Sequence, residues 1–200
     1  MDSQKHTYLE FLFSRINNSA HFLSCACRDH LNSIAFVEHW PKNQFLQMRG
    51  HTVKNVWFVV DGCLRTCYFN EKKTDYVTQW FWFPGNWAGV FSHLFSAAKS
   101  DRVIEAIEDS NVLSFSFDDL VATRLQYPRE WQMITASMIE VYIRDFDMLH
   151  NDLVTLSARE RYRKLLCSHP EVFQMINQKD IASYLNISRE ELSRLRAEKQ

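Results

Sequence analysis

The sequence has little glycine, little proline and almost no net charge. Only four Gly and four Pro occur in 200 residues, which excludes a collagen-like or loop-dominated chain. No stretch reaches the ~20 apolar residues that a membrane-spanning helix needs, and no signal peptide is recognisable. We therefore expect a cytoplasmic protein without a membrane partner. The formal net charge of −1 lacks the overall basicity typical of many nucleic-acid-binding proteins.

The cysteines and histidines are not spaced as metal ligands. Cys25-x-Cys27 and Cys63-x3-Cys67 could supply ligands, but with Cys167 they match no four-cysteine zinc or iron–sulfur pattern, so we expect free thiols. No His-x-His pair is present, which leaves a metal-dependent barrel enzyme without ligands. Since no nucleophile–base pair is recognisable either, the sequence predicts no catalytic residues, no metal site and no identifiable cofactor.

Aromatic residues are abundant, and charge is unevenly divided along the chain. Fifteen Phe, seven Tyr and six Trp require a core or a pocket to receive them. Residues 157–200 hold nine Lys and Arg against six Asp and Glu, whereas residues 1–156 hold fourteen against eighteen. A basic end on an acidic body indicates a protein of two parts.

Two helices, from about His6 to Ile16 and from about Arg28, precede a region of short strands. The Asp61-Gly62 pair predicts a hairpin between the first two strands of the following set. Short strands separated by turns predict an antiparallel sandwich or barrel. The expected strands are Asn55–Val60, Cys63–Phe69, Tyr76–Phe83, Val103–Ile107 and Val112–Phe117.

Helical periodicity begins after Phe117. Asp118 is predicted to cap a short helix, and a helix from Arg129 to Leu156 would span about 42 Å. This long helix has two apolar stripes, so one can pack on the barrel and the other on a second copy of the chain. Burial of both stripes within one chain is the alternative. The predicted dimer interface is Ile139, Tyr142, Ile143, Phe146, Leu149 and Leu153.

The C-terminal segment has the pattern of a helix-turn-helix. Asn177 can cap a helix, Ala182 is small where a second helix must cross closely, and Asn186 tolerates the left-handed conformation needed at the turn. Ser188 can cap the second helix, with Glu191 at the capping-box position. These residues together predict a helix-turn-helix, the alternative being an ordinary helical hairpin with a solvated charged face.

The outer face of the second helix carries the side chains expected of a DNA-reading helix. Arg can pair with guanine O6 and N7 in the major groove, and Glu can accept from cytosine N4. Residues at helix beginnings can hold phosphates. The predicted DNA-binding residues are Gln178, Lys179, Ser188, Arg189, Glu190, Ser193, Arg194 and Arg196.

These motifs resemble the Crp/Fnr family of transcription regulators. The resemblance is most specific over Gln178–Leu185, Ser188–Glu190 and Arg194, and Val56–Arg65 is similar to the family's strand, glycine turn and following Arg. It implies an α+β fold with an antiparallel β-roll (double-stranded β-helix) sensory domain in residues 1–128, a long dimerisation helix in 129–156 and a C-terminal helix-turn-helix in 157–200. It also implies a homodimer that binds double-stranded DNA, with RNA polymerase and a small-molecule effector as further partners, and base contacts by Arg189, Glu190 and Arg194.

The phosphate-binding segment departs from the family pattern. Val90 occupies the family's Glu position, and Asp101 stands where positive charge is needed, with Arg102 two residues late. We therefore expect neither cyclic AMP nor cyclic GMP as the effector. The candidate effector pocket is Arg65, Trp80, Trp82, Trp87, Gly89, Val90 and Arg102, although the tryptophans could instead be plain core. An alternative function is a sensor that acts through protein partners without specific DNA binding.

Overall fold

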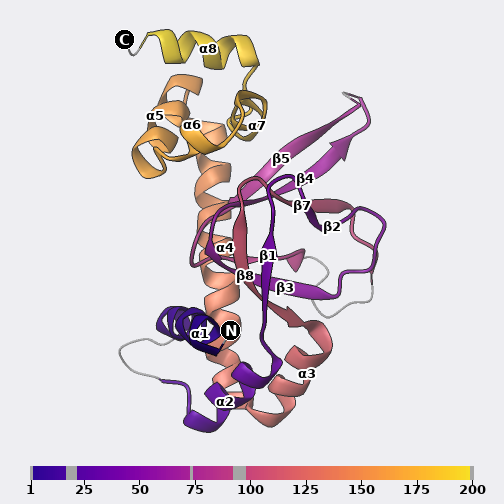
Figure 1. The fold of residues 1–200 in the computed structure, drawn as a ribbon. Helices are drawn as coiled ribbons and strands as arrows, with labels where there is room; N and C mark the ends of the chain where they lie inside the picture. Colours follow the sequence, from indigo (N-terminus) through magenta and orange to yellow (C-terminus); the bar gives the residue numbers. More distant parts are fainter. Residues whose placement is uncertain (1, 17–21, 73, 92–97, 199–200) are drawn as a thin grey trace.

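The computed structural model describes residues 2–16, 22–72, 74–91 and 98–198 (Figure 1). The helices are α1 (Asp2–Ile16), α2 (Cys25–Ile34), α3 (Phe117–Gln126), α4 (Pro128–Thr155), α5 (Ala158–Ser168), α6 (Val172–Met175), α7 (Gln178–Tyr184) and α8 (Arg189–Ala197). The strands are β1 (Phe36–Trp40), β2 (Phe45–Gln47), β3 (Asn55–Asp61), β4 (Leu64–Asn70), β5 (Asp75–Trp82), β6 (Trp87–Ala88), β7 (Arg102–Ala106) and β8 (Ser110–Ser116). This order confirms the predicted α+β class.

Two antiparallel sheets form the β-roll. One sheet has the strand order β1-β8-β3-β6 and the other β2-β7-β4-β5. Phe58 and Phe115 from the first sheet meet Leu64 and Ile104 from the second, and each of these four side chains is 0% exposed. Such complete burial of apolar side chains between two sheets is the main stabilising feature of the roll.

The hairpin predicted at Asp61-Gly62 is wrong. β3 lies between β8 and β6 in one sheet, whereas β4 lies between β7 and β5 in the other, so the chain crosses from one sheet to the other at this point. Gly62 has a φ of 81°, and a Cβ placed there would lie 2.3 Å from Ser110 Oγ. Gly62 is therefore required for two reasons, its positive φ and the close approach of Ser110. A chain that passes from one sheet to the other meets both requirements, as a hairpin turn does.

The helix after the roll begins two residues earlier than predicted. Ser116 caps α3, because its Oγ accepts a hydrogen bond from Asp119 N at 3.1 Å, so the expectation that Asp118 is the cap is wrong. Phe117, the first residue of the helix, is buried. Asp118 is instead exposed in the first turn, where a negative charge suits the positive end of the helix dipole.

Helix α4 runs along the roll from α3 to the four C-terminal helices (Figure 1). Trp131, Ile134 and Met138 in its first half are buried in the same core as the roll and α1. Exposure then increases along the helix, with Ile143 58% and Val154 71% exposed. None of the helices in the described part of the chain has the length and hydropathy needed to cross a membrane.

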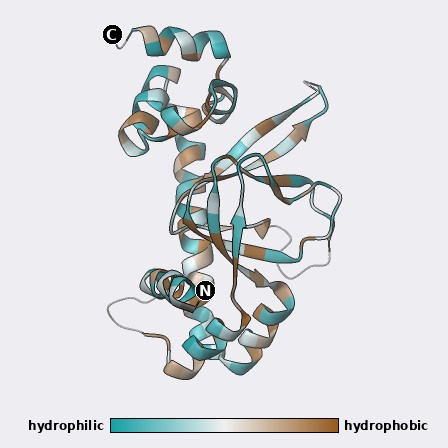
Figure 2. Ribbon diagram, in the orientation of Figure 1, coloured by the Kyte–Doolittle hydropathy of each residue, from teal (hydrophilic) through white to brown (hydrophobic). Residues whose placement is uncertain are grey.

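The C-terminal helices form a second core that includes residues of the roll. Tyr162, Val172, Ile181 and Leu192 are buried there together with Phe81 of β5. Cys63 and Ile107 of the roll belong to the same core. The helical domain therefore packs directly on the outer surface of the β4–β5 sheet, which explains why the end of β5, Trp80 to Trp82, is buried on both faces. In Figure 2, α8 is mostly hydrophilic and lies on the side of this domain away from the roll.

All five cysteines are free thiols, as expected. Burial raises the pKa of Cys67 to about 11 and also raises the pKa of Cys63, so both thiols stay protonated at neutral pH. Within the described ranges, no three His, Cys, Asp or Glu side chains gather as a metal-binding group.

Candidate DNA-reading interface and effector sites

The turn between α7 and α8 is built by the residues that the sequence analysis singled out. Asn177 caps α7, its Oδ1 accepting from Asp180 N at 3.0 Å. Asn186 has a φ of 51°, in the left-handed region, and Ile187 N donates to Ala182 O at 3.0 Å. Ser188 Oγ then accepts from Glu191 N at 3.0 Å and caps α8. The chain therefore forms a complete helix-turn-helix.

The predicted inner faces of the two helices are buried against each other. Ala182 is 2% exposed, which fits the need for a small side chain where α7 and α8 cross. Leu192 is 0% and Leu195 7% exposed. Ile181 and Leu185 complete the contact and are 0% and 2% exposed.

The outer face of α8 points to solvent. Arg189, Glu190, Ser193 and Arg194 are exposed, and Arg196 is half-buried. The Arg194 side chain is 68% exposed, and its guanidinium lies 3.7 Å from Glu191 Oε1, a loose pair within one helix. Gln178 and Ser188, at the first turns, are exposed as well. The donors and acceptors of this face are therefore accessible to a partner.

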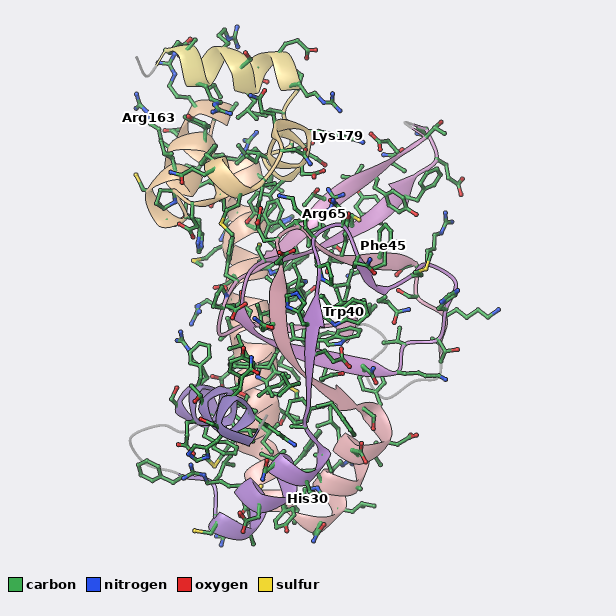
Figure 3. All side chains as sticks on the ribbon, viewed as in Figure 1. His30, Trp40, Phe45, Arg65, Arg163 and Lys179 are labelled. Carbon is green, nitrogen blue, oxygen red and sulfur yellow. The ribbon has the colours of Figure 1, made fainter. Side chains whose placement is uncertain are left out.

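Lys179 differs from the other predicted DNA contacts. Its Nζ lies 2.5 Å from Asp75 Oδ1 at the start of β5, and Figure 3 shows the residue at the boundary between the helical domain and the roll. The hydrogen bond from Lys179 lowers the pKa of the Asp75 carboxyl below its ordinary value. A phosphate group would have to compete with Asp75 for this ammonium.

Arg65 lies outside the candidate effector pocket to which we assigned it. Its guanidinium pairs with Asp180 of α7, and its NH2 nitrogen lies 2.8 Å from Glu105 Oε2 of β7. The three side chains are 13%, 4% and 11% exposed. Burial alone would lower the Arg65 pKa, but the Asp180 and Glu105 carboxylates outweigh it and keep the pKa above its ordinary value. Arg65 thus joins the roll to the helix-turn-helix (Figure 3).

Two further contacts hold α7 on β5. Thr78 N donates to Ser183 Oγ at 2.9 Å, and the rings of Phe81 and Tyr184 lie 4.9 Å apart. The contacts of Thr78, Ser183, Asp75 and Asp180 could not be predicted from the sequence, because their partners lie more than a hundred residues away. One feature of the sequence does point to the Arg65 ion pairs: Arg65 is the only charged residue of β4.

The three tryptophans of the candidate effector pocket are packed as core. Trp80, Trp82 and Trp87 are 7%, 3% and 4% exposed, and Tyr142 of α4 stacks on Trp82 at 5.7 Å. The cavity left between them and α4 is only about 10 Å³, less than the smallest effector needs. Gly89 and Val90 are buried beside this cluster. This packing favours the alternative interpretation, in which the three tryptophans are core residues.

Arg102 lies apart from the tryptophans, on a separate open hollow of about 330 Å³. Arg49, Tyr68 and Gln79 also line it. Asp101 Oδ1 lies 3.5 Å from Arg102 Nε, so an acidic group opposes the one cation that we expected to reach a ligand phosphate. The structure therefore does not bring together the seven predicted pocket residues.

The six predicted dimer residues fall into two groups. Ile139, Tyr142 and Leu149 pack against the roll core within one chain. Ile143 and Phe146 are 58% and 42% exposed, and Leu153 is half-buried. The exposed group remains the candidate surface for a second copy, whereas the first group already has its partners.

Comparison with known proteins gives solved structures alone: no family model matches the sequence, and no curated protein matches it. FixK2 from Bradyrhizobium japonicum is similar with a TM-score of 0.69 and 18% identity over 82% of this chain and 84% of that one. The c-di-GMP-responsive global regulator CLP of Xanthomonas campestris matches with a TM-score of 0.69 and 11% identity, over 88% and 92%.

A transcriptional regulator of the Crp/Fnr family from Eubacterium rectale gives a TM-score of 0.69 and 16% identity, covering 86% of this chain and 82% of that one. These names are those of regulators and not of enzymes. Each of these matches covers more than four-fifths of both chains, so the chain has the fold of the Crp/Fnr regulators.

Proposed function

We propose that the protein is a homodimeric transcription regulator that reads double-stranded DNA through α8. The observation that carries this proposal is the exposed face of α8 on a complete helix-turn-helix. Arg189, Glu190 and Arg194 project from it and are accessible to a partner. A helix of this kind fits the major groove, where its side chains can reach base edges.

The side chains of α8 suit specific bases. Arg189 and Arg194 can each donate two hydrogen bonds to guanine O6 and N7, and Glu190 can accept from cytosine N4. Gln178 and Ser188 stand at helix N-termini, where backbone and side-chain donors hold phosphates and set the register of the helix in the groove. Lys179 would add a phosphate contact once it leaves Asp75.

The exposed second half of α4 supports a dimer. Ile143, Phe146 and Val154 expose apolar surface on one helix, and a two-fold contact would bury it. A dimer would also present two α8 helices to successive major grooves, about 34 Å apart. An effector and RNA polymerase complete the proposed scheme as partners of this dimer.

Selection of bound sequences from random duplex DNA tests the proposal. The expected result is enrichment of a two-fold-symmetric site, and a variant in which Arg189 and Arg194 are both replaced by Ala should enrich none. Absence of enrichment with the wild-type protein would favour the alternative, a sensor that acts through protein partners.

A further inference from the structure

A cavity of about 310 Å³ lies where the roll, α4 and the helix-turn-helix domain meet. It is lined by Phe81 and Phe83 of the roll, by Met148 and Asp152 of α4, and by Tyr184 of α7. Its volume is at the lower end of the range for small-molecule sites. By contrast, the space beside the tryptophans of the roll is about 10 Å³. A small molecule therefore fits the junction of the domains and not the tryptophan cluster.

The walls of the cavity are aromatic on two sides. Trp80, Phe81 and Phe83 come from the roll, and Tyr184 faces them from α7, its ring 4.9 Å from that of Phe81. No hydrogen bond to the Tyr184 hydroxyl occurs within the described part of the chain. Aromatic faces bind planar rings, and they attract cations through their negative faces.

The cavity is lined by two carboxylates and by two cationic side chains, Arg161 and Lys164. Asp145 and Asp152 both line it. Lys164 is paired with Asp152, the two atoms Nζ and Oδ2 lying 2.6 Å apart. Arg161 donates from Nε to Leu185 O at 3.1 Å and from NH1 to Leu156 O at 2.5 Å, so it holds helix ends together.

Asp145 is the carboxylate left for a ligand. It is paired with Arg144, its neighbour in α4, whose side chain is 64% exposed and whose Nε lies 3.1 Å from Oδ1. An exposed pair of this kind is weak. Burial, with Asp145 and Asp152 nearby, raises the pKa of Tyr184 to about 12.

We propose that this cavity is an effector site for a planar aromatic molecule with one positive charge, such as a protonated aromatic amine. The ring would lie against the aromatic wall that Phe81, Phe83 and Tyr184 form, and the ammonium would pair with Asp145. Such an occupant touches the roll, α4 and α7 together, so its binding would change how the helix-turn-helix is held. The proposal rests on the proposed function only in calling the occupant an effector.

Three probes with one ring and different charges test the site: tryptamine, indole and indole-3-acetate, titrated into the full-length protein by calorimetry. We expect tryptamine to bind at least ten-fold more tightly than indole, and indole-3-acetate to bind most weakly. Asp145→Asn should remove the preference for tryptamine. Asp147→Asn, on an exposed position of the same helix, should leave it intact. Tighter binding of indole-3-acetate, equal binding of the three probes, or no binding at millimolar concentration would overturn the proposal.

The effector role has its own readout. At saturating tryptamine, the affinity of the protein for duplex DNA should change at least three-fold, and this change should be lost in Asp145→Asn. Tryptamine binding with an unchanged DNA affinity would overturn the effector role. A protein that binds tryptamine but no DNA, with or without it, would overturn the proposed function while leaving the binding site itself intact.

Discussion

Arg65 of β4 and Asp180 of α7 form a buried ion pair across the boundary between the β-roll and the helix-turn-helix. Glu105 of β7 shares the same guanidinium, so one arginine serves two carboxylates. Asp180 also accepts from the side chain of Asn177, the cap of α7, at 2.6 Å. The cap residue of the helix-turn-helix is thus linked, through Asp180 and Arg65, to the β4 strand of the roll.

Replacement of Arg65 by Ala should be strongly destabilising. It would leave two buried carboxylates without a cation, a change that costs about 3–5 kcal/mol. Arg49→Ala is the control, because Arg49 is 48% exposed and lies 3.8 Å from Glu71, a contact worth less than about 1 kcal/mol. Urea unfolding of both variants measures the difference. Equal stability of the two variants would show that the Arg65 network has no net effect.

Replacement of Arg194 by Ala should weaken DNA binding at the preferred site by about 1–3 kcal/mol and relax the base preference there. Arg124→Ala serves as the control, since Arg124 is an exposed arginine of α3 at the far end of the molecule. Fluorescence anisotropy with the selected duplex and single-base variants gives both quantities. An Arg194→Ala protein with unchanged base preference would contradict the role that we assign to α8.

Asp75→Asn should change the salt dependence of DNA binding, whereas Lys179→Ala should have little effect on it. Asp75→Asn releases Lys179 for a phosphate, so it should strengthen binding to all sequences alike. If wild-type Lys179 stays on Asp75 in the complex, the slope of log K against log salt should steepen by about 0.9 in this variant. If Lys179 stays on Asp75, Lys179→Ala should bind DNA no more weakly than the wild-type protein does. A loss of DNA affinity in Lys179→Ala, with no gain in Asp75→Asn, would contradict this prediction. It would show that a DNA phosphate already replaces Asp75 as the partner of Lys179 in the wild-type complex.

Ile143→Glu should separate the dimer and abolish tight DNA binding together. Ile143 is 58% exposed, whereas Phe146 also contacts Trp80 and Tyr142 within the chain, so Ile143 is the cleaner test of the apolar surface. Leu125→Glu, at a leucine of α3 that is 78% exposed, is the matched control. Light scattering at micromolar concentration gives the mass. A wild-type protein with the mass of one chain would contradict the dimer.

Cyclic AMP and cyclic GMP should bind no more tightly than about millimolar, near −4 kcal/mol. Arg102 is opposed by Asp101 at 3.5 Å, and the tryptophans leave a cavity of only about 10 Å³ beside α4. The family's arrangement of a fixed, buried cation for the phosphate is therefore not formed here. Calorimetric titration decides the matter, and a micromolar dissociation constant for either nucleotide would show that Arg102 does reach the phosphate.

The helix-turn-helix could be predicted from the sequence because its determinants are local. Asn177, Asn186 and Ser188 each act on backbone groups within a few residues, and the buried positions of α7 and α8 follow helical spacing. Short-range hydrogen bonds and periodicity are visible in a single sequence.

The contacts between domains could not be predicted, because they depend on which surfaces meet. Arg65 was placed in the effector pocket, yet its partners are Glu105 in a neighbouring strand and Asp180 in a later domain. The Asp61-Gly62 pair led us to predict a hairpin; Gly62 does have a positive φ, but a turn residue does not determine which strands pair. In both cases the sequence specified a local requirement and left the long-range partner open.

Methylation interference on the selected duplex tests the central claim, that α8 reads DNA in the major groove as part of a symmetric dimer. Methylation of guanine N7 blocks the bidentate contact of an arginine. The account predicts two symmetric clusters of interfering guanines with centres about 10 base pairs apart, and loss of one guanine from each cluster in Arg194→Ala. Interference confined to one cluster, or absent from guanine N7, would contradict it.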